Sequence, residues 1–303
     1  MYNQNQNEKT AKIGLVLTDP EDWTARAFLR NIEKRRAIAV PLNLATFSAS
    51  VSSSDFSIFD ANSKKVELDA LIVRDVGISF ALEQISFKFD LLRQFETSMP
   101  VMNSSEAIQN AANKFFSFAL FKQAQLPIPR TVVTAEIEIA LNALEEFGSG
   151  VVKPIFGSQG KGVVKLESSQ PDVTSKLAAL LNERGVLYVQ EFIPNQGRDI
   201  RVFVVGEEAV GAIYRVSVGD SFVSNLSQGG TPLKCELREE IKELAVRATK
   251  AVGADFAGVD LIEGAEGLIV LEINGTPSGK GINRACGIDV TERIVDLLFE
   301  RLD

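Results

Sequence analysis

The last quarter of the chain contains three oxygen-bearing side chains whose types and spacing suit a metal site. Glu272 and Asn274 are two residues apart at the end of an apolar run, so an extended strand would point both to one face. Asp260 lies in the preceding apolar run, and it becomes their cross-strand neighbour if the two runs pair as a hairpin. Carboxylate and amide oxygens are hard ligands. The pattern therefore predicts a site for Mg²⁺ or Mn²⁺ rather than for zinc.

The segment between the two runs favours a hairpin. Residues 263–267 read Glu-Gly-Ala-Glu-Gly, and the glycines can supply the positive φ of a reversing chain. The alternative is an acidic edge hairpin whose carboxylates face water, where charged side chains are usually found. Glu272, however, directly follows Leu-Ile-Val-Leu, where an unpaired charge would be costly. We therefore favour the metal-binding hairpin.

A second group of residues could bind phosphate. Lys153 ends an apolar run and precedes a turn that contains Gly157, Gly160 and Gly162, after which the chain is apolar again. Glycines let backbone N–H groups approach phosphate oxygens closely, and Lys153 would add a positive charge. This is not a Walker loop, because the lysine precedes the glycines and no Gly-Lys-Ser/Thr opens a helix. Glycine-rich hairpins also occur for purely structural reasons, so both interpretations stay open.

The composition limits the chemistry further. The 303 residues are 45% hydrophobic, enough for a packed core and two or three lobes. A net charge of −8 argues against broad nucleic-acid binding, although local arginines could still hold a small anionic substrate. Histidine is absent, which removes the commonest general base and every Ser-His arrangement. Catalysis must therefore use carboxylates, lysine, arginine or a metal.

The chain shows the features of a cytoplasmic protein. Residues 1–10 are polar and lack the apolar core of a signal peptide. No run reaches the ~18 apolar residues of a membrane span. The two cysteines, Cys235 and Cys286, do not have a metal-type spacing, and a disulfide framework is not expected. We expect no membrane partner and no nucleic-acid partner.

The first hundred residues alternate short apolar runs, which predict buried strands, with segments of helical periodicity. Residues 48–57 are serine-rich and are predicted to be a loop. The predicted strands are residues 12–18, 38–44, 68–75 and 100–103, and the predicted helices are residues 23–36, 79–95 and 104–121.

Four charged side chains of this first lobe could contact a substrate. Ligands of open α/β sheets bind beyond the carboxyl ends of the strands, where these residues would lie. Surface salt bridges are the equally weighted alternative. The four residues are Asp22, Arg26, Arg74 and Asp75.

The second half of the chain reads as antiparallel strands with one further helix. Residues 186–193 form an apolar strand that could present main-chain donors and acceptors to an adenine. Residues 199–215 read as two strands around a tight turn, and alternation places Asp199 and Arg201 on one face. Further predicted elements are a strand at 130–133, the glycine-rich hairpin at 151–164 and a helix at 238–252.

Together these residues resemble the ATP-grasp superfamily, and within it the RimK-type α-L-glutamate ligases. The resemblance runs from about Ser104 to the C-terminus, where separate motifs occur in the family's order. They are Asn113-Lys114, Val-Val-Lys153-Pro with the glycine-rich turn, Gln190-Glu191-Phe192-Ile193, Asp199-Ile-Arg201, Arg215, Ser224-Asn225, Asp260 and Glu272-Ile-Asn274-Gly-Thr-Pro277.

The resemblance implies a fold that is part α/β and part α+β, an ATP-grasp fold with an N-terminal Rossmann-like domain. It places that α/β pre-ATP-grasp domain at residues 1–103, the small ATP-grasp lobe at 104–187, and the large lobe with the metal hairpin at 188–303. In this family ATP lies between two α+β lobes.

The resemblance also implies roles for individual residues. Lys114 and Lys153 would contact the phosphates, Glu191 and Phe192 the adenine, and Asp199 the ribose. Arg215 and Asn225 would lie near the reacting phosphoryl group, and Arg201 and Ser224 belong to the nucleotide-binding set together with the three turn glycines. Asp260, Glu272 and Asn274 would hold two Mg²⁺ ions, with Mn²⁺ able to substitute.

The implied activity is ATP-dependent addition of L-glutamate to an acidic, carboxylate-bearing acceptor through an acyl phosphate. The acceptor would be a coenzyme tail, as in the tetrahydromethanopterin and F420 ligases, or a protein C-terminus, as in the enzymes that modify ribosomal protein S6. Val223 stands where the family often has an arginine, and residues 276–281 also depart from the S6-modifying members, so the acceptor stays open. A non-catalytic ATP-binding module and a ligase for another amino acid are the alternatives, and a homo-oligomer is compatible with each.

Overall fold

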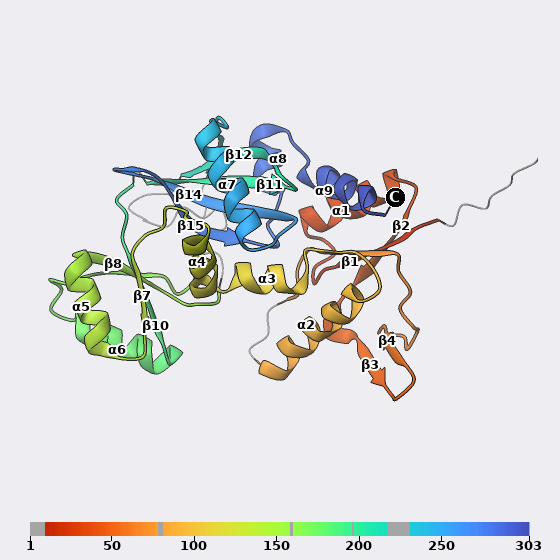
Figure 1. The fold of residues 1–303 in the computed structure, drawn as a ribbon, viewed down its shortest axis with the longest axis horizontal. Helices are drawn as coiled ribbons and strands as arrows, with labels where there is room; N and C mark the ends of the chain where they lie inside the picture. Colours follow the sequence, from red (N-terminus) through yellow and green to blue (C-terminus); the bar gives the residue numbers. More distant parts are fainter. Residues whose placement is uncertain (1–9, 78–80, 158–159, 196, 217–230, 303) are drawn as a thin grey trace, which may run out of the picture. The chain divides into compact units, whose positions relative to one another are not determined.

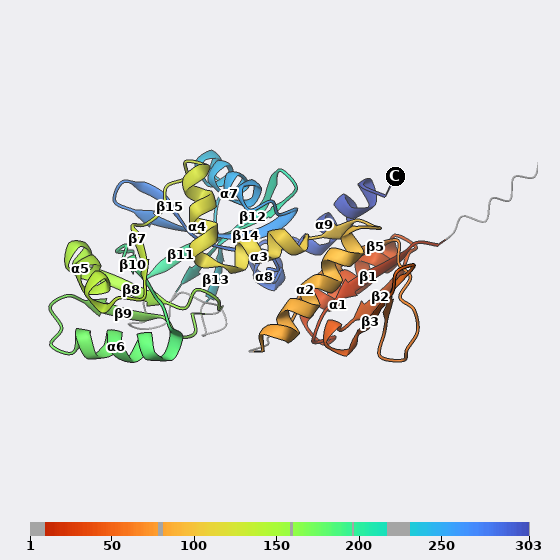
Figure 2. The same ribbon diagram turned by 60° about the horizontal axis from the view of Figure 1, so that its bottom comes forward.

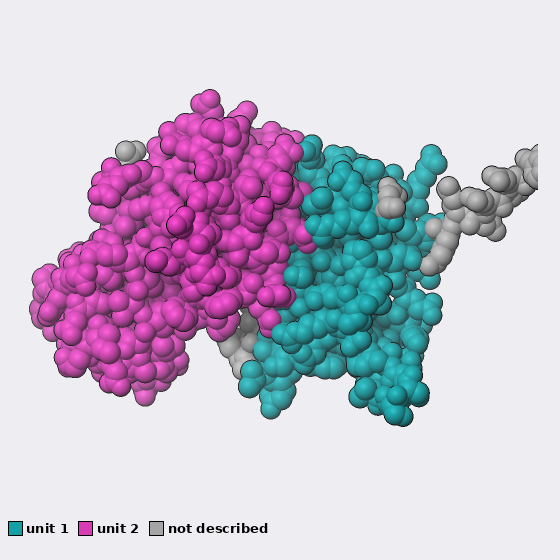
Figure 3. All heavy atoms as spheres, in the orientation of Figure 1, with its two compact units in different colours: residues 1–105, 276–280, 289–303 teal, residues 106–275, 281–288 magenta. Residues whose placement is uncertain are grey.

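The computed structural model describes residues 10–77, 81–157, 160–195, 197–216 and 231–302, and its chain folds into two compact units (Figures 1 and 3). Unit 1 comprises residues 1–105, 276–280 and 289–303, and unit 2 comprises residues 106–275 and 281–288. Among the described residues, no helix has the length and apolar character needed to cross a membrane.

Unit 1 is built on a parallel sheet, as the alternating sequence pattern predicted. The strand order is β2-β1-β5-β6, with bounds Ile38–Leu42, Lys12–Val16, Ala70–Val73 and Val101–Met102. All four residues of β5 are buried, which explains its uninterrupted apolar run. The helices of this unit are α1 (Trp23–Lys34), α2 (Leu82–Glu96) and α9 (Val290–Glu300), and the 3₁₀ turn η1 (Leu44–Thr46) follows β2.

The prediction of a loop at residues 48–57 is wrong. Strands β3 (Ser48–Val51) and β4 (Phe56–Phe59) pair there as an antiparallel hairpin. All of β3 is exposed, so it buries no side chains that could produce an apolar run. Its pairing uses backbone hydrogen bonds, which a serine-rich strand makes as well as any other.

Unit 2 contains two antiparallel sheets (Figure 2), and each has its own apolar core. The smaller has the order β7-β10-β8-β9, with bounds Thr131–Thr134, Leu187–Glu191, Ser149–Lys153 and Val164–Glu167. Helices α5 (Ile137–Phe147) and α6 (Val173–Arg184) pack on it, and the core between them includes Leu144, Val152 and Leu177. The predicted glycine-rich hairpin is the β8–β9 pair.

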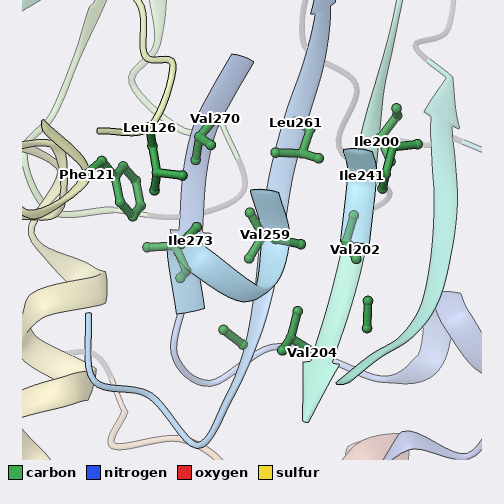
Figure 4. Close-up of a cluster of buried hydrophobic side chains, with 14 of the residues drawn as sticks. Phe121, Leu126, Ile200, Val202, Val204, Ile241, Val259, Leu261, Val270 and Ile273 are labelled. Carbon is green, nitrogen blue, oxygen red and sulfur yellow. The ribbon is translucent and has the colours of Figure 1, made fainter. Parts of the chain in front are cut away.

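The larger sheet of unit 2 is covered on one face by α7 (Glu239–Ala251). Its order is β13-β12-β11-β14-β15, with bounds Thr231–Lys234, Glu208–Val216, Arg198–Val205, Phe256–Gly264 and Gly267–Asn274. Val202, Val259 and Ile273 contribute to the core beneath α7 (Figure 4). On the sheet's other face, Ile282 of α8 (Lys280–Cys286) lies against Gly211, where an added Cβ would meet its Cγ2 at 2.9 Å.

The single helix predicted for residues 104–121 is in fact two helices. Helix α3 (Ser105–Ala112) ends before Asn113, and α4 (Lys114–Gln123) begins after it. Asn113 is the N-cap of α4, where its side chain accepts a 3.0 Å hydrogen bond from the backbone N–H of Phe116. Asparagine competes well for this position because its side chain satisfies an otherwise unpaired helix donor. The cap fixes where Lys114 begins the second helix.

Loss of this cap should destabilise the chain measurably. We expect Asn113→Ala to lower the free energy of unfolding by about 1 kcal/mol, since one helix donor loses its partner. Urea denaturation measures the change. Glu136→Ala is the matched control, because Glu136 is the N-cap of α5 and its side chain makes no cap hydrogen bond. Equal losses in the two variants would contradict the role of Asn113.

Candidate functional site

The hairpin of β14 and β15 brings the predicted metal ligands onto one face of the larger sheet. Asp260 is the direct cross-strand partner of Glu272, and Gly258 is that of Asn274. Directly opposed residues point to the same face, so the predicted pairing of Asp260 with Glu272 is present. The register shifts after this pair, because Leu261 pairs with Val270 and Leu271 is left as a bulge.

Asp260 is held by two arginines from the neighbouring strands. It is 3% exposed, and Arg201, its cross-strand partner on β11, binds both carboxylate oxygens. Nη2 of Arg215 on β12 lies 2.8 Å from Oδ2 of Asp260. Burial alone would raise the pKa of Asp260, but the two guanidinium groups outweigh it and hold that pKa below its usual value. The carboxylate is therefore buried in its charged form.

Arg215 also binds a second buried carboxylate. Its Nε and Nη2 donate to the two oxygens of Asp199 at 2.6 and 2.7 Å, and the two residues are cross-strand partners. Burial raises the pKa of Asp199 to about 6, against the opposing effect of Arg215. Burial would lower the pKa of Arg215, but Asp260 and Asp199 reverse that effect and raise it. Two cations and two carboxylates thus balance each other in the sheet.

Lys114 connects the hairpin to the glycine-rich turn. Its ammonium lies 3.2 Å from Oε1 of Glu272 and donates a 2.7 Å hydrogen bond to the carbonyl of Gly157. Its backbone N–H also donates to the carbonyl of Ile155. One largely buried lysine therefore contacts both motifs that the sequence analysis singled out.

The turn glycines adopt backbone conformations that other residues rarely adopt. The φ angles of Gly157, Gly160 and Gly162 are +147°, +69° and +71°. Gly157 and Gly160 line the cavity described below. The carbonyl of Gly162 accepts a 2.9 Å hydrogen bond from Arg184, which ties the end of the turn to α6.

A cavity joins these groups, and all its lining residues belong to unit 2. Charged side chains from both sheets face it, among them Lys114, Lys153, Asp199, Arg215, Asp260 and Glu272. Apolar and aromatic residues, including Val151, Phe192, Ile193 and Ile262, complete the lining. A cavity lined by apolar, aromatic and charged side chains can bind a ligand that carries both a flat base and an anionic tail.

Lys153 is the cation of the smaller sheet in this cavity. Its ammonium donates a 2.6 Å hydrogen bond to Oε1 of Gln190. Burial lowers the pKa of Lys153 to about 8, and the neighbouring Lys114 lowers it further while Glu272 and Asp260 raise it. Lys153 is therefore charged near neutrality but loses its proton at moderately alkaline pH.

The residues expected at the adenine are partly engaged elsewhere. Arg130 binds the carboxylate of Glu191 through Nε and Nη2, both at 2.9 Å, and this contact lowers the pKa of Glu191. The backbone N–H groups of Glu191 and Phe192 donate to the carbonyls of Arg130 and Ser149. The ring of Phe192 has the ammonium of Lys165 4.2 Å from its centroid. The Glu191 carboxylate and the Phe192 ring therefore already have charged partners, and the adenine contacts of these two residues stay a prediction.

The four charged residues proposed for the first lobe make local contacts within unit 1. Asp22 caps α1 and binds Arg74 at 2.9 Å, and Arg74 also donates to the carbonyl of Thr276. Asp75 accepts hydrogen bonds from Thr18 and Gly77, while Arg26 pairs with Glu21. Ser224 and Asn225 lie outside the described residues.

Sequence reasoning did not single out Gln190, Arg130 and Lys165, which surround the predicted site residues. The sequence carries little to mark these three residues as functional. Gln190 appeared only as the first residue of a family motif, and Arg130 only as the first residue of a short predicted strand. The alternation of β10 could have indicated that Tyr188 and Gln190 share a face, but not which residues of β7 and β8 they meet.

Comparison with known proteins identifies the family. A model of the RimK-like ATP-grasp domain matches residues 111–298. The tetrahydromethanopterin:alpha-L-glutamate ligase of Methanosarcina acetivorans is 45% identical over 95% of this chain and 98% of its own length. The chain belongs to the RimK-like ATP-grasp family. The predicted family and fold are thereby confirmed, and the protein is an ATP-dependent ligase.

A further curated relative agrees with this assignment, and a solved structure agrees with the fold. A probable alpha-L-glutamate ligase of Trichodesmium erythraeum is 32% identical over 96% of this chain and 97% of its own length. The ATP-grasp ligase PsnB, solved in complex with a minimal precursor, Mg and ADP, superimposes with a TM-score of 0.73. It is 23% identical and covers 96% of this chain and 98% of its own. PsnB supports the fold alone.

The side chains of this RimK-like protein fit the Mg²⁺ that such ligases use. Asp260 and Glu272 supply hard oxygen donors from paired strands, and Asn274 lies two residues further along β15. Asp260 is kept charged by two arginines although it is buried. Among the described residues no cluster of three His, Cys, Asp or Glu side chains occurs, so a third protein ligand would come from the amide of Asn274.

The low pKa of Lys153 predicts a pH dependence of nucleotide binding. Lys153 is protonated below its pKa of about 8, so the attraction for phosphate that we predict for it would be lost as the pH rises through that value. We expect the Kd for ADP without metal to rise about tenfold between pH 7 and pH 9, as measured by calorimetry. Lys153→Met should remove this dependence. A rise of the same size in that variant would contradict the prediction.

Proposed function

We propose that this chain adds L-glutamate to a carboxylate at the end of a coenzyme tail, with a pterin coenzyme of the tetrahydromethanopterin type as the acceptor. Three ligases named for tetrahydromethanopterin support this choice, since they are similar over 93–95% of this chain and 96–98% of their own lengths. The geometric support is the cavity in which Lys114, Lys153 and Arg215 face Asp260 and Glu272.

The reaction would proceed in two steps that the side chains of this cavity can assist. A carboxylate oxygen of the acceptor attacks the γ-phosphorus of ATP, and ADP leaves, which gives an acyl phosphate. The amine of glutamate then attacks the acyl carbon, loses a proton and expels inorganic phosphate. Such transfers depend on positioning and charge neutralisation rather than on a covalent enzyme intermediate.

The residues around the cavity would each contact a different part of bound ATP. Lys114 and Lys153 would contact the phosphates, near the turn that contains Gly157, Gly160 and Gly162. The base would lie against Phe192 beside Glu191, with Asp199 and Arg201 on the sheet next to the ribose. Asp260, Glu272 and Asn274 would hold two Mg²⁺ ions, with Mn²⁺ able to substitute, and the bound ions would neutralise phosphate charge.

Arg215 is proposed to stabilise the negative oxygen that develops during amine attack. Among the described residues its contacts with Asp199 and Asp260 use Nε and Nη2, and Nη1 is the nitrogen proposed to donate to the reacting group. Asp199 and Asp260 fix the guanidinium plane, which reduces the entropy lost when it binds a reacting group. For Asn225 and Ser224 we propose only the roles that the family resemblance implies.

Removal of a proposed metal ligand should lower the rate strongly. We expect Glu272→Ala to reduce glutamate-dependent ADP release more than tenfold with the pterin acceptor, because bound metal contributes several kcal/mol. Glu263→Ala is the matched control, since Glu263 lies on the same hairpin but pairs with Arg198 outside the cavity.

Two results would contradict this proposal. One is that the wild-type protein releases no ADP with glutamate and the acceptor. A single-turnover measurement of ATP cleavage would then distinguish a non-catalytic ATP-binding module from a ligase that uses another amino acid. The other is Glu272→Ala with the activity of Glu263→Ala. Mass spectrometry of the acceptor counts the glutamates that are added.

A further inference from the structure

Gln190 is a buried amide whose polar atoms face three different side chains. It is 1% exposed and lies on β10, the strand between β7 and β8. Its Oε1 accepts the 2.6 Å hydrogen bond from Lys153, and its Nε2 donates to the hydroxyls of Tyr188 and Thr131, both at 3.1 Å. The amide therefore has a partner at each end.

The partners of Nε2 determine which way the amide points. The hydroxyl of Thr131 donates to the carbonyl of Pro129 at 3.1 Å, so its oxygen is left to accept from Gln190. Tyr188 is 1% exposed, and burial raises its pKa, so it stays a neutral phenol with lone pairs available. A flipped amide would place its nitrogen against the ammonium of Lys153. Only the observed orientation places the amide oxygen against the donor of Lys153 and the amide nitrogen against the acceptors of Tyr188 and Thr131.

This chain of hydrogen bonds crosses the smaller sheet. Thr131 is the cross-strand partner of Gln190 on β7, and Lys153 is the partner of Tyr188 on β8. Three neighbouring strands therefore set the position of one ammonium group. A lysine side chain is otherwise flexible and loses much rotamer entropy when it is fixed on binding. The hydrogen bond to Gln190 already restrains Lys153 in the free protein, so less rotamer entropy is lost when a ligand binds.

The side chain of Gln190 is uncharged, so its hydrogen bond does not reduce the positive charge that Lys153 brings to the cavity. An amide oxygen leaves the full positive charge of Lys153 available, whereas a carboxylate at 2.6 Å would cancel most of it. Among the described residues, the charged groups that act on Lys153 include Lys114, Glu272 and Asp260, whose combined charge is −1 when all three are ionised. Because these neighbouring groups carry a net negative charge, an anionic ligand would be repelled without the positive charge of Lys153.

We propose that Gln190 is a positioning residue that holds the ammonium of Lys153 toward the nucleotide phosphates, and that Tyr188 and Thr131 orient it. The inference rests on the proposed contact of Lys153 with the phosphates. It extends that function to residues that act through Lys153, and it assigns a specific reason for an amide at position 190.

A double-mutant cycle on nucleotide affinity tests this. Calorimetry would give the Kd of ADP and of adenosine for wild type, Gln190→Met, Lys153→Met and the double variant. We expect Gln190→Met to weaken ADP about tenfold, the usual size for a hydrogen bond to a charged group, and adenosine less than about twofold. In the Lys153→Met background, Gln190→Met should cause no further loss.

Two conservative variants make the test independent of folding defects. Gln190→Glu keeps the shape of the side chain, and it should weaken ADP more than Gln190→Met does because it neutralises Lys153. Tyr188→Phe removes one orienting acceptor without a change of volume. It should weaken ADP about threefold, a fraction of the full effect, and have no effect with Lys153→Met.

The possible outcomes distinguish a failure of this inference from a failure of the proposed contact between Lys153 and the phosphates. Additive losses in the cycle, or equal losses for ADP and adenosine, would show a merely structural role and overturn the inference. The same holds if Lys153→Met weakens ADP while neither Gln190→Glu nor Tyr188→Phe does. If Lys153→Met leaves ADP affinity unchanged, the phosphate role of Lys153 is itself wrong and the inference falls with it.

Discussion

The site depends on one buried ionic arrangement, in which Asp260 is bound by Arg201 and Arg215 while Arg215 also binds Asp199. A lone carboxylate at this depth would be neutralised or would destabilise the fold. Two guanidinium groups and two carboxylates balance one another, so Asp260 can stay ionised at 3% exposure. Ionised carboxylate oxygens are the ligands that Mg²⁺ and other hard divalent cations prefer.

Strand register is what makes this arrangement possible. Arg201 opposes Asp260, Asp199 opposes Arg215, and Asp260 opposes Glu272. A slip of one residue in any of these pairings would turn the charged side chains to the opposite face. The apolar residues between them, such as Val202, Val259 and Ile273, belong to the core beneath α7 and hold that register. Packing of the apolar face of the larger sheet against α7 thus determines which charged side chains lie opposite one another on its other face.

The two sheets of unit 2 contribute different side chains to the shared cavity. The larger sheet supplies Asp199, Asp260 and Glu272 together with Arg215, and the smaller supplies Lys153 and Glu191 beside the glycine-rich turn. Lys114 belongs to neither sheet and contacts both, because the cap at Asn113 starts α4 beside them. A RimK-like ligase needs both sets, since its phosphoryl donor is strongly anionic and its acceptor is a carboxylate.

The sequence predicted the parts of the site that depend on local spacing. The separation of Glu272 and Asn274, the turn at 263–267 and the lysine before the glycines are all short-range signals, and each lies in the predicted hairpin. The pairing of Arg201 with Asp260 spans 59 residues, so it follows only from the sheet order. The helix break at Asn113 was missed because apolar periodicity continues through it. The role of Gln190 depends on three strands at once, which no single periodicity reveals.

The most direct test of the ionic arrangement is the effect of Mg²⁺ on ADP affinity, measured by calorimetry in wild type, Asp260→Asn and the control Glu263→Gln. Asp260→Asn keeps the shape of the side chain and removes its charge. If Asp260 is held charged in order to bind metal, Mg²⁺ should tighten ADP at least about tenfold in wild type and in the control, and by less than about twofold in Asp260→Asn. Equal tightening in all three proteins would contradict the account.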